Sequence, residues 1–277
     1  MSPKRVCLAM SGGVDSAAAA LLLRQQGYEV HAVTLRLRPG DQRSGVCGSG
    51  DDIALAQKLA AAMGIEHTVL DLCDLFRDTV MANFTAEYAR GRTPNPCVDC
   101  NREIKFGALL DWALDQGADA MATGHYARVR LDTPSGRWQL LRGADRRKDQ
   151  TYFLYQLTQH QLAHLLLPVG GYEKSGIRAL AAGHGLENAQ KPDSQDICFV
   201  PDGDYAAFLE RQGMALRPGN FVDQTGRVLG PHRGMERYTT GQRKGLGVSA
   251  GAPVYVLRKD LASGDVVLGP DRALYTH

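Results

Sequence analysis

The sequence predicts an α/β fold in which a domain with a parallel sheet is followed by a small β-rich domain. Over the first 125 residues, short apolar runs alternate with runs of helix formers, as in the right-handed βαβ units of parallel sheets. From Gly213 onward, the apolar runs become short and are separated by Gly, Pro and Asp, which is typical of a compact β module. We therefore divide the chain into a first domain of residues 1–207 and a second of residues 208–277.

The individual elements follow from apolar periodicity and from the glycines that end helices. The expected strands of the first domain are residues 5–10, 29–35, 65–70 and 120–123, and residues 128–141 form a hairpin. The expected helices are residues 17–26, 51–63, 72–90, 103–116, 151–166, 173–183 and 204–212. In the second domain, the apolar runs at residues 221–222, 227–229 and 254–257 are the expected strands.

The composition is that of an ordinary globular protein, with 44% hydrophobic and 22% charged residues. The longest aliphatic run, residues 17–23, is far shorter than the roughly 18 residues of a membrane span. We therefore expect a cytoplasmic protein without a membrane partner. In a reducing compartment, the six cysteines do not indicate a structural disulfide framework.

Charge is distributed unevenly along the chain. The net charge is +2, but residues 211–277 carry ten Lys and Arg against five Asp and Glu, so the remainder of the chain is net negative. A basic, glycine-rich segment beside a mildly acidic body favours a polyanionic partner such as RNA.

The segment Ser11-Gly-Gly-Val-Asp-Ser16 joins the first expected strand to the first expected helix. Such a turn directs unpaired N–H groups at one spot under the positive end of the helix dipole, where anions and phosphate bind. The ends of two further parallel strands, residues 35–36 and 123–125, carry non-core residues, so we expect all three segments to meet at one pocket. We expect Asp15 to cap the helix, with Mg²⁺ ligation as the alternative.

Three cysteines stand in polar segments. Cys97 and Cys100 form a C-x-x-C pair at the start of a helix, where the dipole lowers the pKa of a thiol. The pair is consistent with half of a zinc site, a redox dithiol or a catalytic thiol with a neighbour, but no second C-x-x-C or histidine pair completes a zinc site. Cys198 lies far downstream, Cys7 and Cys73 are expected in the core, and Cys47 has no assigned role.

The motif S-G-G-x-D-S resembles the pyrophosphatase (PP) loop of enzymes that split ATP between its α and β phosphates and transfer AMP to an oxygen. With five further segments in order, the chain resembles the tRNA-specific 2-thiouridylases, which put sulfur on the wobble uridine. These segments are T-G-H-Y-A (123–127), L-R-G-A-D (141–145), K-D-Q-T-Y-F-L (148–154), D-S-Q-D-I-C-F (193–199) and Y-T-T-G-Q-R-K-G-L-G (238–247). The resemblance implies an adenine-nucleotide α-hydrolase-like (PP-loop) fold for the first domain.

The resemblance also implies an ATP-dependent tRNA-uridine 2-sulfurtransferase. ATP, with Mg²⁺, would be held by Ala9, Met10, Ser11, Gly12, Gly13, Val14, Asp15, Ser16, Leu35 and Gly124. Cys198 would receive a persulfide from a sulfur-donor protein, Cys100 would be the nucleophile, and the two would form a transient disulfide. The target base would contact Asn95, Pro96 and Cys97, and the tRNA would contact Lys148, Asp149 and Gln150.

Two departures from the family pattern affect these expectations. Many relatives carry Asp where this chain has Cys97, and Asp99 is not its counterpart, so the acid–base role stays unassigned. Relatives continue past residues 266–269 into a further β-barrel that grips tRNA, whereas this chain ends at His277, so we expect weaker tRNA binding than in full-length relatives.

Cys97 leaves two versions of the chemistry open. In one, no metal takes part, Cys100 and Cys198 do persulfide chemistry and Cys97 tunes their pKa values. In the other, Cys97, Cys100 and Cys198 bind a [4Fe–4S] cluster whose fourth iron is open. We favour the first version because two-cysteine relatives suffice for it.

Two other functions remain as alternatives. Another PP-loop adenylating enzyme would leave Cys100 and Cys198 unexplained. A non-catalytic tRNA-binding relative would leave the intact ATP loop and both cysteines unexplained.

Overall fold

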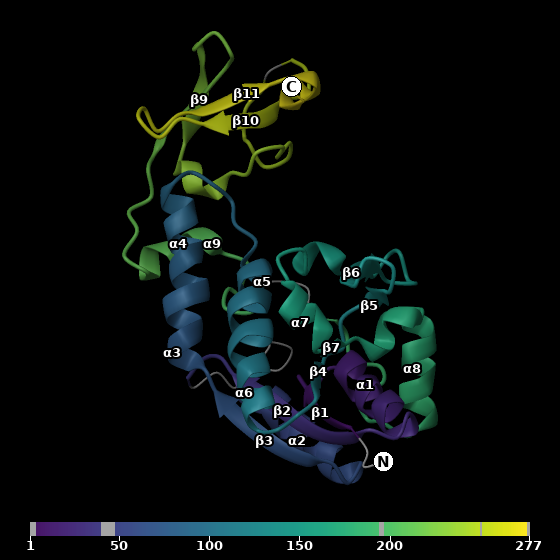
Figure 1. Cartoon of the computed structure of the whole chain (residues 1–277). Coiled ribbons are helices and arrows are strands. Elements are labelled where there is room, and N and C mark those ends of the chain that lie inside the picture. The colour runs from purple at the N-terminus through teal and green to yellow at the C-terminus, as the bar shows by residue number, and fades with distance from the viewer. Residues whose placement is uncertain (1–3, 40–47, 194–196, 250, 276–277) are drawn as a thin grey trace. The chain divides into compact units, whose positions relative to one another are not determined.

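The computed structural model describes residues 4–39, 48–193, 197–249 and 251–275 (Figure 1). Contacts divide the chain into two compact units. The first unit is Met1–Val80 with Cys97–Phe199, and the second is Met81–Pro96 with Val200–His277. That Met81–Pro96 packs with the C-terminal part of the chain was not predicted from the sequence. The predicted division between residues 207 and 208 stays a prediction.

A five-stranded sheet with parallel pairing throughout forms the centre of the first unit. Its strands are β1 (Arg5–Ala9), β2 (Glu29–Arg36), β3 (Glu66–Asp71), β4 (Ala120–Ala122) and β7 (Leu165–Leu166). The order β3-β2-β1-β4-β7 means that the chain leaves β1 toward one edge and later returns to its other side. The predicted parallel sheet is confirmed, and a ligand crevice is expected where the strand order reverses, beside the carboxyl end of β1.

Side chains of β1 alternate between two cores, as a period of two residues requires. Val6 and Leu8 lie in one core with apolar residues of α1 (Val14–Gln25), α2 (Gly50–Ala62) and α8 (Lys174–Gly183). Cys7 lies in the other core, with Phe106 and the helix that follows it. Helices therefore cover both faces of the sheet, and the predicted core position of Cys7 is confirmed.

Two of the predicted helices contain π-helical segments. The helix expected at residues 72–90 consists of α3 (Cys73–Phe76), a π-helical segment Arg77–Met81 and α4 (Ala82–Ala89). The helix expected at residues 103–116 begins earlier and consists of α5 (Pro96–Asp99), a π-helical segment Cys100–Ala108 and α6 (Leu109–Asp115). Pro96 begins it because proline is well tolerated in a first helical turn. None of the helices within the described ranges is long and apolar enough to cross a membrane.

The single helix expected at residues 151–166 was also wrong. That stretch contains a 3₁₀ turn (Thr151–Phe153), the short helix α7 (Gln159–Ala163) and strand β7. Leu165 and Leu166 pair with β4 at the edge of the sheet. The prediction failed here because periodicity does not distinguish a strand from a helix in a short apolar run. The expected hairpin is confirmed as β5 (Ala127–Asp132) and β6 (Arg137–Arg142).

The second unit contains a four-stranded sheet, which confirms the prediction of a β-rich domain. Its order is β10-β11-β8-β9, from β8 (Gly219–Val222), β9 (Val228–His232), β10 (Tyr255–Lys259) and β11 (Val266–Gly269). Phe221, Val256 and Val266 are central in its core. Aromatic side chains join its helices, since the Phe84 ring of α4 lies 5.7 Å from the Phe208 ring of α9 (Tyr205–Arg211).

Candidate functional site

The turn between β1 and α1 has the shape that its glycines allow. Gly12 has a φ of +73°, and a Cβ at this position would lie 2.6 Å from the carbonyl oxygen of Asp52. Only glycine both adopts this positive φ without strain and has no Cβ to clash with Asp52. Gly13 differs, because a Cβ at this position would meet only the hydroxyl oxygen of Ser11, at 3.4 Å. The fold therefore requires glycine at position 12, while the backbone at position 13 is open to a ligand.

Hydrogen bonds hold this loop in place. The Ser11 N–H donates to Ser16 Oγ at 3.2 Å, and the Ser16 hydroxyl donates to the Gly13 carbonyl at 3.0 Å. The side-chain amide of Asn188 donates to the Gly12 carbonyl at 3.1 Å. Because these bonds are already formed in the structure, the loop is preorganised for an anion.

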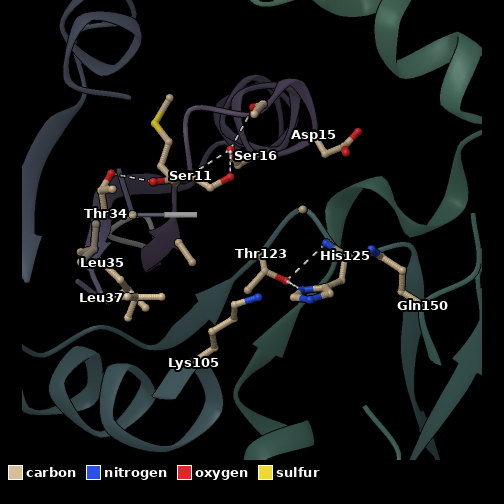
Figure 2. A pocket seen from close by; sticks show the side chains of 16 residues that line it. Ser11, Asp15, Ser16, Thr34, Leu35, Leu37, Lys105, Thr123, His125 and Gln150 are labelled. Atoms are coloured by element: carbon tan, nitrogen blue, oxygen red, sulfur yellow. Dashed lines mark hydrogen bonds between the residues drawn. The ribbon is translucent and has the colours of Figure 1, made fainter. Parts of the chain in front are cut away.

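Three strand ends meet at one pocket, as predicted (Figure 2). Its lining includes the loop after β1, Thr34 and Leu35 of β2, and the Thr123-Gly-His125 segment after β4. Eight of the ten predicted nucleotide-binding residues line it, all except Gly12 and Val14. At Gly124 a Cβ would lie 2.8 Å from the backbone N of Ser16, so glycine is what lets this segment approach the loop.

The electrostatics of the pocket suit an anionic ligand. Lys105 is the one Lys or Arg among the described residues that line it, and it comes from the π-helical segment that begins with Cys100. The His125 ring accepts or donates a 2.7 Å bond with the Thr123 hydroxyl. Burial, followed by repulsion from Lys105, holds the pKa of His125 well below its ordinary value, so this imidazole is neutral.

Asp15 does not cap α1, so that prediction was wrong. The N-cap is Gly13, without a side-chain cap bond. The Asp15 carboxylate instead accepts a hydrogen bond from the Tyr126 hydroxyl at 2.8 Å and two from Lys174 Nζ, both at 2.7 Å. Hydrogen bonds between an ammonium and a carboxylate are stronger than neutral hydrogen bonds, which favours this arrangement over a cap.

Lys174 was not among the predicted site residues, although one signal for it was present in the sequence. Lys174 is the first residue of α8, where a cation is unfavourable against the helix dipole. A lysine in that place indicates a partner from elsewhere in the fold.

The predicted tRNA-contacting residues of the first unit lie beside this pocket. Lys148 and Asp149 line a second cavity, which shares Ser11, Gly13, Asp15 and Gln150 with the first. Lys148 Nζ lies 2.7 Å from a carboxylate oxygen of Asp193, and Asp149 accepts the Gly143 N–H at 2.8 Å. The Gln150 side-chain oxygen accepts the Tyr126 N–H at 2.9 Å. These contacts thus also stabilise the segment that contains residues 148–150. Of the other predicted tRNA-contacting residues, Asn95 and Pro96 belong to the second unit.

The cysteines differ in exposure. Cys100 is buried, Cys198 is half-buried and Cys97 is exposed. Phe199, next to Cys198, packs against Phe76 with ring centroids 5.8 Å apart, which anchors this end of its segment. Residues 194–196 of the same motif lie outside the described residues, as does Cys47.

Neither pairing of the cysteines is visible in the described part of the chain. The Cys100–Cys198 disulfide implied by the resemblance is not shown there. The described residues also include no group of three or more His, Cys, Asp or Glu arranged to hold a metal ion, so Cys97, Cys100 and Cys198 are not placed as cluster ligands. We therefore derive no step through an iron–sulfur cluster.

The other two cysteines have raised pKa values, so both are poor nucleophiles. Burial raises the pKa of Cys7 to about 12. Cys73 is half-buried, so its expected core position was wrong, and partial burial together with Asp71 raises its pKa to about 11.

Comparison with known proteins places these features in a family. Residues 4–202 match the family model described as the tRNA methyl transferase HUP domain, and residues 206–270 match the tRNA methyl transferase PRC-barrel domain. The first match agrees with the expected PP-loop fold. A solved 4-thiouridine synthetase–RNA complex with bound ATP aligns with a TM-score of 0.48 at 16% identity, over 76% of this chain and 50% of that chain, too distant a likeness to support an inference.

Curated relatives are much closer. A protein of Carboxydothermus hydrogenoformans named tRNA-specific 2-thiouridylase MnmA is 51% identical over 99% of this chain and 76% of its own length. Proteins of the same name from Heliobacterium modesticaldum and Bradyrhizobium sp. are each 50% identical, over 97% and 99% of this chain and 71% and 70% of their own lengths. The resemblance of the motifs is thereby confirmed, and this chain belongs to the tRNA-specific 2-thiouridylase family.

Proposed function

We propose that this chain converts the wobble uridine of tRNA to 2-thiouridine in the cytoplasm, with ATP as the activating substrate. One observation supports this most directly. The PP-type loop, the two other strand ends and the helix that carries Cys100 all belong to one compact unit and border one pocket through Ser11, Leu35, Gly124 and Lys105.

ATP makes the uridine oxygen a leaving group. The C2 carbonyl oxygen attacks the α-phosphorus, the bond to the β-phosphate breaks, and pyrophosphate leaves. The loop N–H groups and the N-terminus of α1 stabilise the negative charge on the phosphates. The backbone of Ser11–Ser16 thus holds the phosphates, and Leu35 and Gly124 contact the rest of the nucleotide.

Sulfur then replaces the activated oxygen. A donor protein leaves a persulfide on Cys198, and its terminal sulfur attacks C2 while AMP departs with the original oxygen. The Cys100 thiolate attacks the Cys198 sulfur, so the S–S bond to the uridine breaks and its electron pair forms the C2 thiocarbonyl. The product is 2-thiouridine plus a Cys100–Cys198 disulfide, which an external thiol must reduce before the next turnover.

Magnesium completes the substrate, since ATP is used as its Mg²⁺ complex in most phosphate-transfer sites. No residue is assigned to the ion, because both Asp15 oxygens accept bonds from Lys174.

tRNA binding is assigned to Asn95, Pro96, Cys97, Lys148, Asp149, Gln150 and the basic residues of 211–277. Arg243 and Lys244 of the G-Q-R-K-G segment are exposed. For each phosphate contact removed, the slope of log affinity against log salt should fall by about 0.7–0.9. Replacing Arg243 and Lys244 by Ala should reduce the slope in a filter-binding series, and an unchanged slope would contradict their assignment.

The whole proposal is tested by single-turnover reaction of the chain with tRNA, ATP and a persulfide donor. We expect mass spectrometry to detect one 2-thiouridine for each AMP and pyrophosphate released. Release of ADP and phosphate would contradict adenylation, and AMP release without thiolation would favour another PP-loop adenylating enzyme.

A further inference from the structure

A carboxylate in a phosphate-binding loop needs an explanation. Asp15 belongs to the loop whose backbone is proposed to hold the phosphates of ATP, and its side chain is 28% exposed. Like charges repel strongly over a few ångströms where water is partly excluded. Unless its charge is neutralised, Asp15 opposes the ligand that its own loop binds.

Lys174 supplies the neutralising charge. Its ammonium lies 2.7 Å from both oxygens of Asp15 and 2.8 Å from an oxygen of Asp193. An ammonium has three N–H donors, and these three acceptors use all of them. The Lys174 side chain is therefore already satisfied by the fold and has no donor to offer a phosphate.

Tyr126 provides the remaining contact with Asp15. Its hydroxyl donates to Oδ1 at 2.8 Å. Burial, and then the charge of Asp15, raises the pKa of Tyr126, so the phenol stays protonated as a donor. Figure 2 shows the Asp15 side chain directed away from Thr34 and Leu35, on the far side of Ser16.

The fold fixes Lys174 at both ends. The residue is 8% exposed, and its backbone N–H donates to Asp145 Oδ2 at 3.0 Å. Its ammonium lies 5.6 Å from the centre of the Tyr126 ring, a cation–π distance. A lysine held at the backbone and at the ammonium keeps one position.

Other cations near Lys174 pair with Asp193. Asp193 also pairs with Lys148 at 2.7 Å and with Arg178 at 3.4 Å. Within this set, the three cations Lys148, Lys174 and Arg178 face the two carboxylates Asp15 and Asp193. Asp145 adds a third carboxylate next to Lys174, so the cations offset the carboxylates of the cluster and Asp15 is not left uncompensated beside the loop.

We propose that Lys174 is a positioning residue of the nucleotide site: it neutralises Asp15 and holds its carboxylate away from the phosphate position, without contacting the ligand. This role rests on the proposed function, because the ligand is taken to be ATP. A lysine that contacted the phosphates would be needed for ATP binding whatever residue stood at position 15. In the proposed role, ATP binding needs the Lys174 ammonium only while Asp15 is charged.

A double-mutant cycle tests that difference. ATP affinity is measured by calorimetry on the full chain with Mg²⁺ and without tRNA. Lys174→Met should weaken binding at least about tenfold, because truncating one partner of a desolvated ion pair leaves the other charge uncompensated. Asp15→Asn should bind within about threefold of the wild type, and the double variant Asp15→Asn/Lys174→Met should recover that same range.

The control is Lys58→Met, which removes the exposed Lys58–Glu187 pair and should leave ATP affinity unchanged. A double variant as weak as Lys174→Met alone would mean that Lys174 contacts the phosphates, and a tenfold loss in Asp15→Asn alone would mean that Asp15 is a metal ligand. Either result, or unchanged affinity in Lys174→Met, overturns the proposal.

The test also covers the case in which Lys174→Met does not fold. If Lys174→Met fails to fold, Asp15→Asn and the double variant decide the question, because neither carries a buried unpaired carboxylate at position 15. Equal affinities of these two support the proposal, and a tenfold difference overturns it. A wild-type chain that does not bind ATP contradicts the proposed function itself, whereas wild-type binding with an unrescued double variant contradicts only the role of Lys174.

Discussion

The two functional segments of the first unit, the PP-type loop and the helix that carries Cys97 and Cys100, are built in opposite ways. Side chains from three distant segments hold the loop, through Asn188 on Gly12 and through Tyr126 and Lys174 on Asp15. The cysteine helix instead changes its winding, and Cys100 is the first residue of a nine-residue π-helical segment.

This difference indicates how each segment serves its chemistry. An anion site gains from being rigid before the ligand arrives, because no binding energy is then spent on ordering it. A π-helical segment joins residues five apart by hydrogen bonds, which brings Lys105, on the pocket, about one turn from Cys100. The loop therefore positions the nucleotide, and the helix connects the thiol to the nucleotide pocket.

The largest expected effect separates the two segments completely. Cys100→Ser or Cys198→Ser should lower single-turnover thiolation at least about a thousandfold, because a hydroxyl cannot form or break the S–S bond. Calorimetric ATP affinity should stay unchanged, since neither cysteine lines the nucleotide pocket in the described structure. Cys97→Ser is the matched control and should retain activity. Its loss of activity together with a visible iron–sulfur absorbance band would overturn our preference for the persulfide route.

The next effect distinguishes the two glycines of the loop. Gly13→Val should lower ATP affinity at least about a hundredfold while the melting temperature changes by only a few degrees, because its side chain occupies ligand space rather than protein space. Gly12→Val should instead unfold the chain at a clearly lower temperature, because of its positive φ and the clash with Asp52. If ATP affinity survives Gly13→Val, the phosphates do not lie on this loop.

A smaller effect tests the winding of the cysteine helix. At Gly107 a Cβ would lie 2.9 Å from the Arg102 carbonyl oxygen, five residues earlier. Gly107→Ala should therefore destabilise the protein by about 1–3 kcal/mol in urea unfolding. The control is Gly176→Ala in α8, where nothing lies within 4 Å of a Cβ and alanine should stabilise by up to about 1 kcal/mol. Equal stability changes for the two variants would argue against the π-helical winding.

The smallest effect concerns His125, whose ring lies beside the Lys105 side chain in the pocket (Figure 2). The folded-state pKa of His125 is depressed, so the folded protein keeps it neutral while the unfolded chain takes up a proton near pH 6.5. Its contribution to stability is fully present above that pH and is lost as the pH falls toward 5, by at most about 1.4 kcal/mol per pH unit. His125→Asn should flatten this part of the curve of unfolding free energy against pH, and an unchanged slope would assign the slope to other groups.

The same contrast explains what could be predicted from the sequence. The loop, the parallel sheet and the meeting of three strand ends follow from local signals, namely glycines, apolar runs and the geometry of βαβ units. The partners of Asp15 could not be predicted, because Tyr126 and Lys174 are 111 and 159 residues away in the sequence and no local sequence pattern indicates such distant contacts. The π-helical winding at Cys100 also could not be predicted, since helical periodicity does not distinguish α-helical from π-helical winding over nine residues.

The discontinuous second unit has a consequence for synthesis on the ribosome. Phe84 and Tyr88 leave the ribosome more than 100 residues before Tyr205 and Phe208, against which the Phe84 ring finally packs. At 5–20 residues per second, this delay lasts roughly 6–25 s. During that interval the Phe84 ring lacks its contacts with Tyr205 and Phe208, so residues 81–96 should bind a chaperone, whose release should coincide with the emergence of α9.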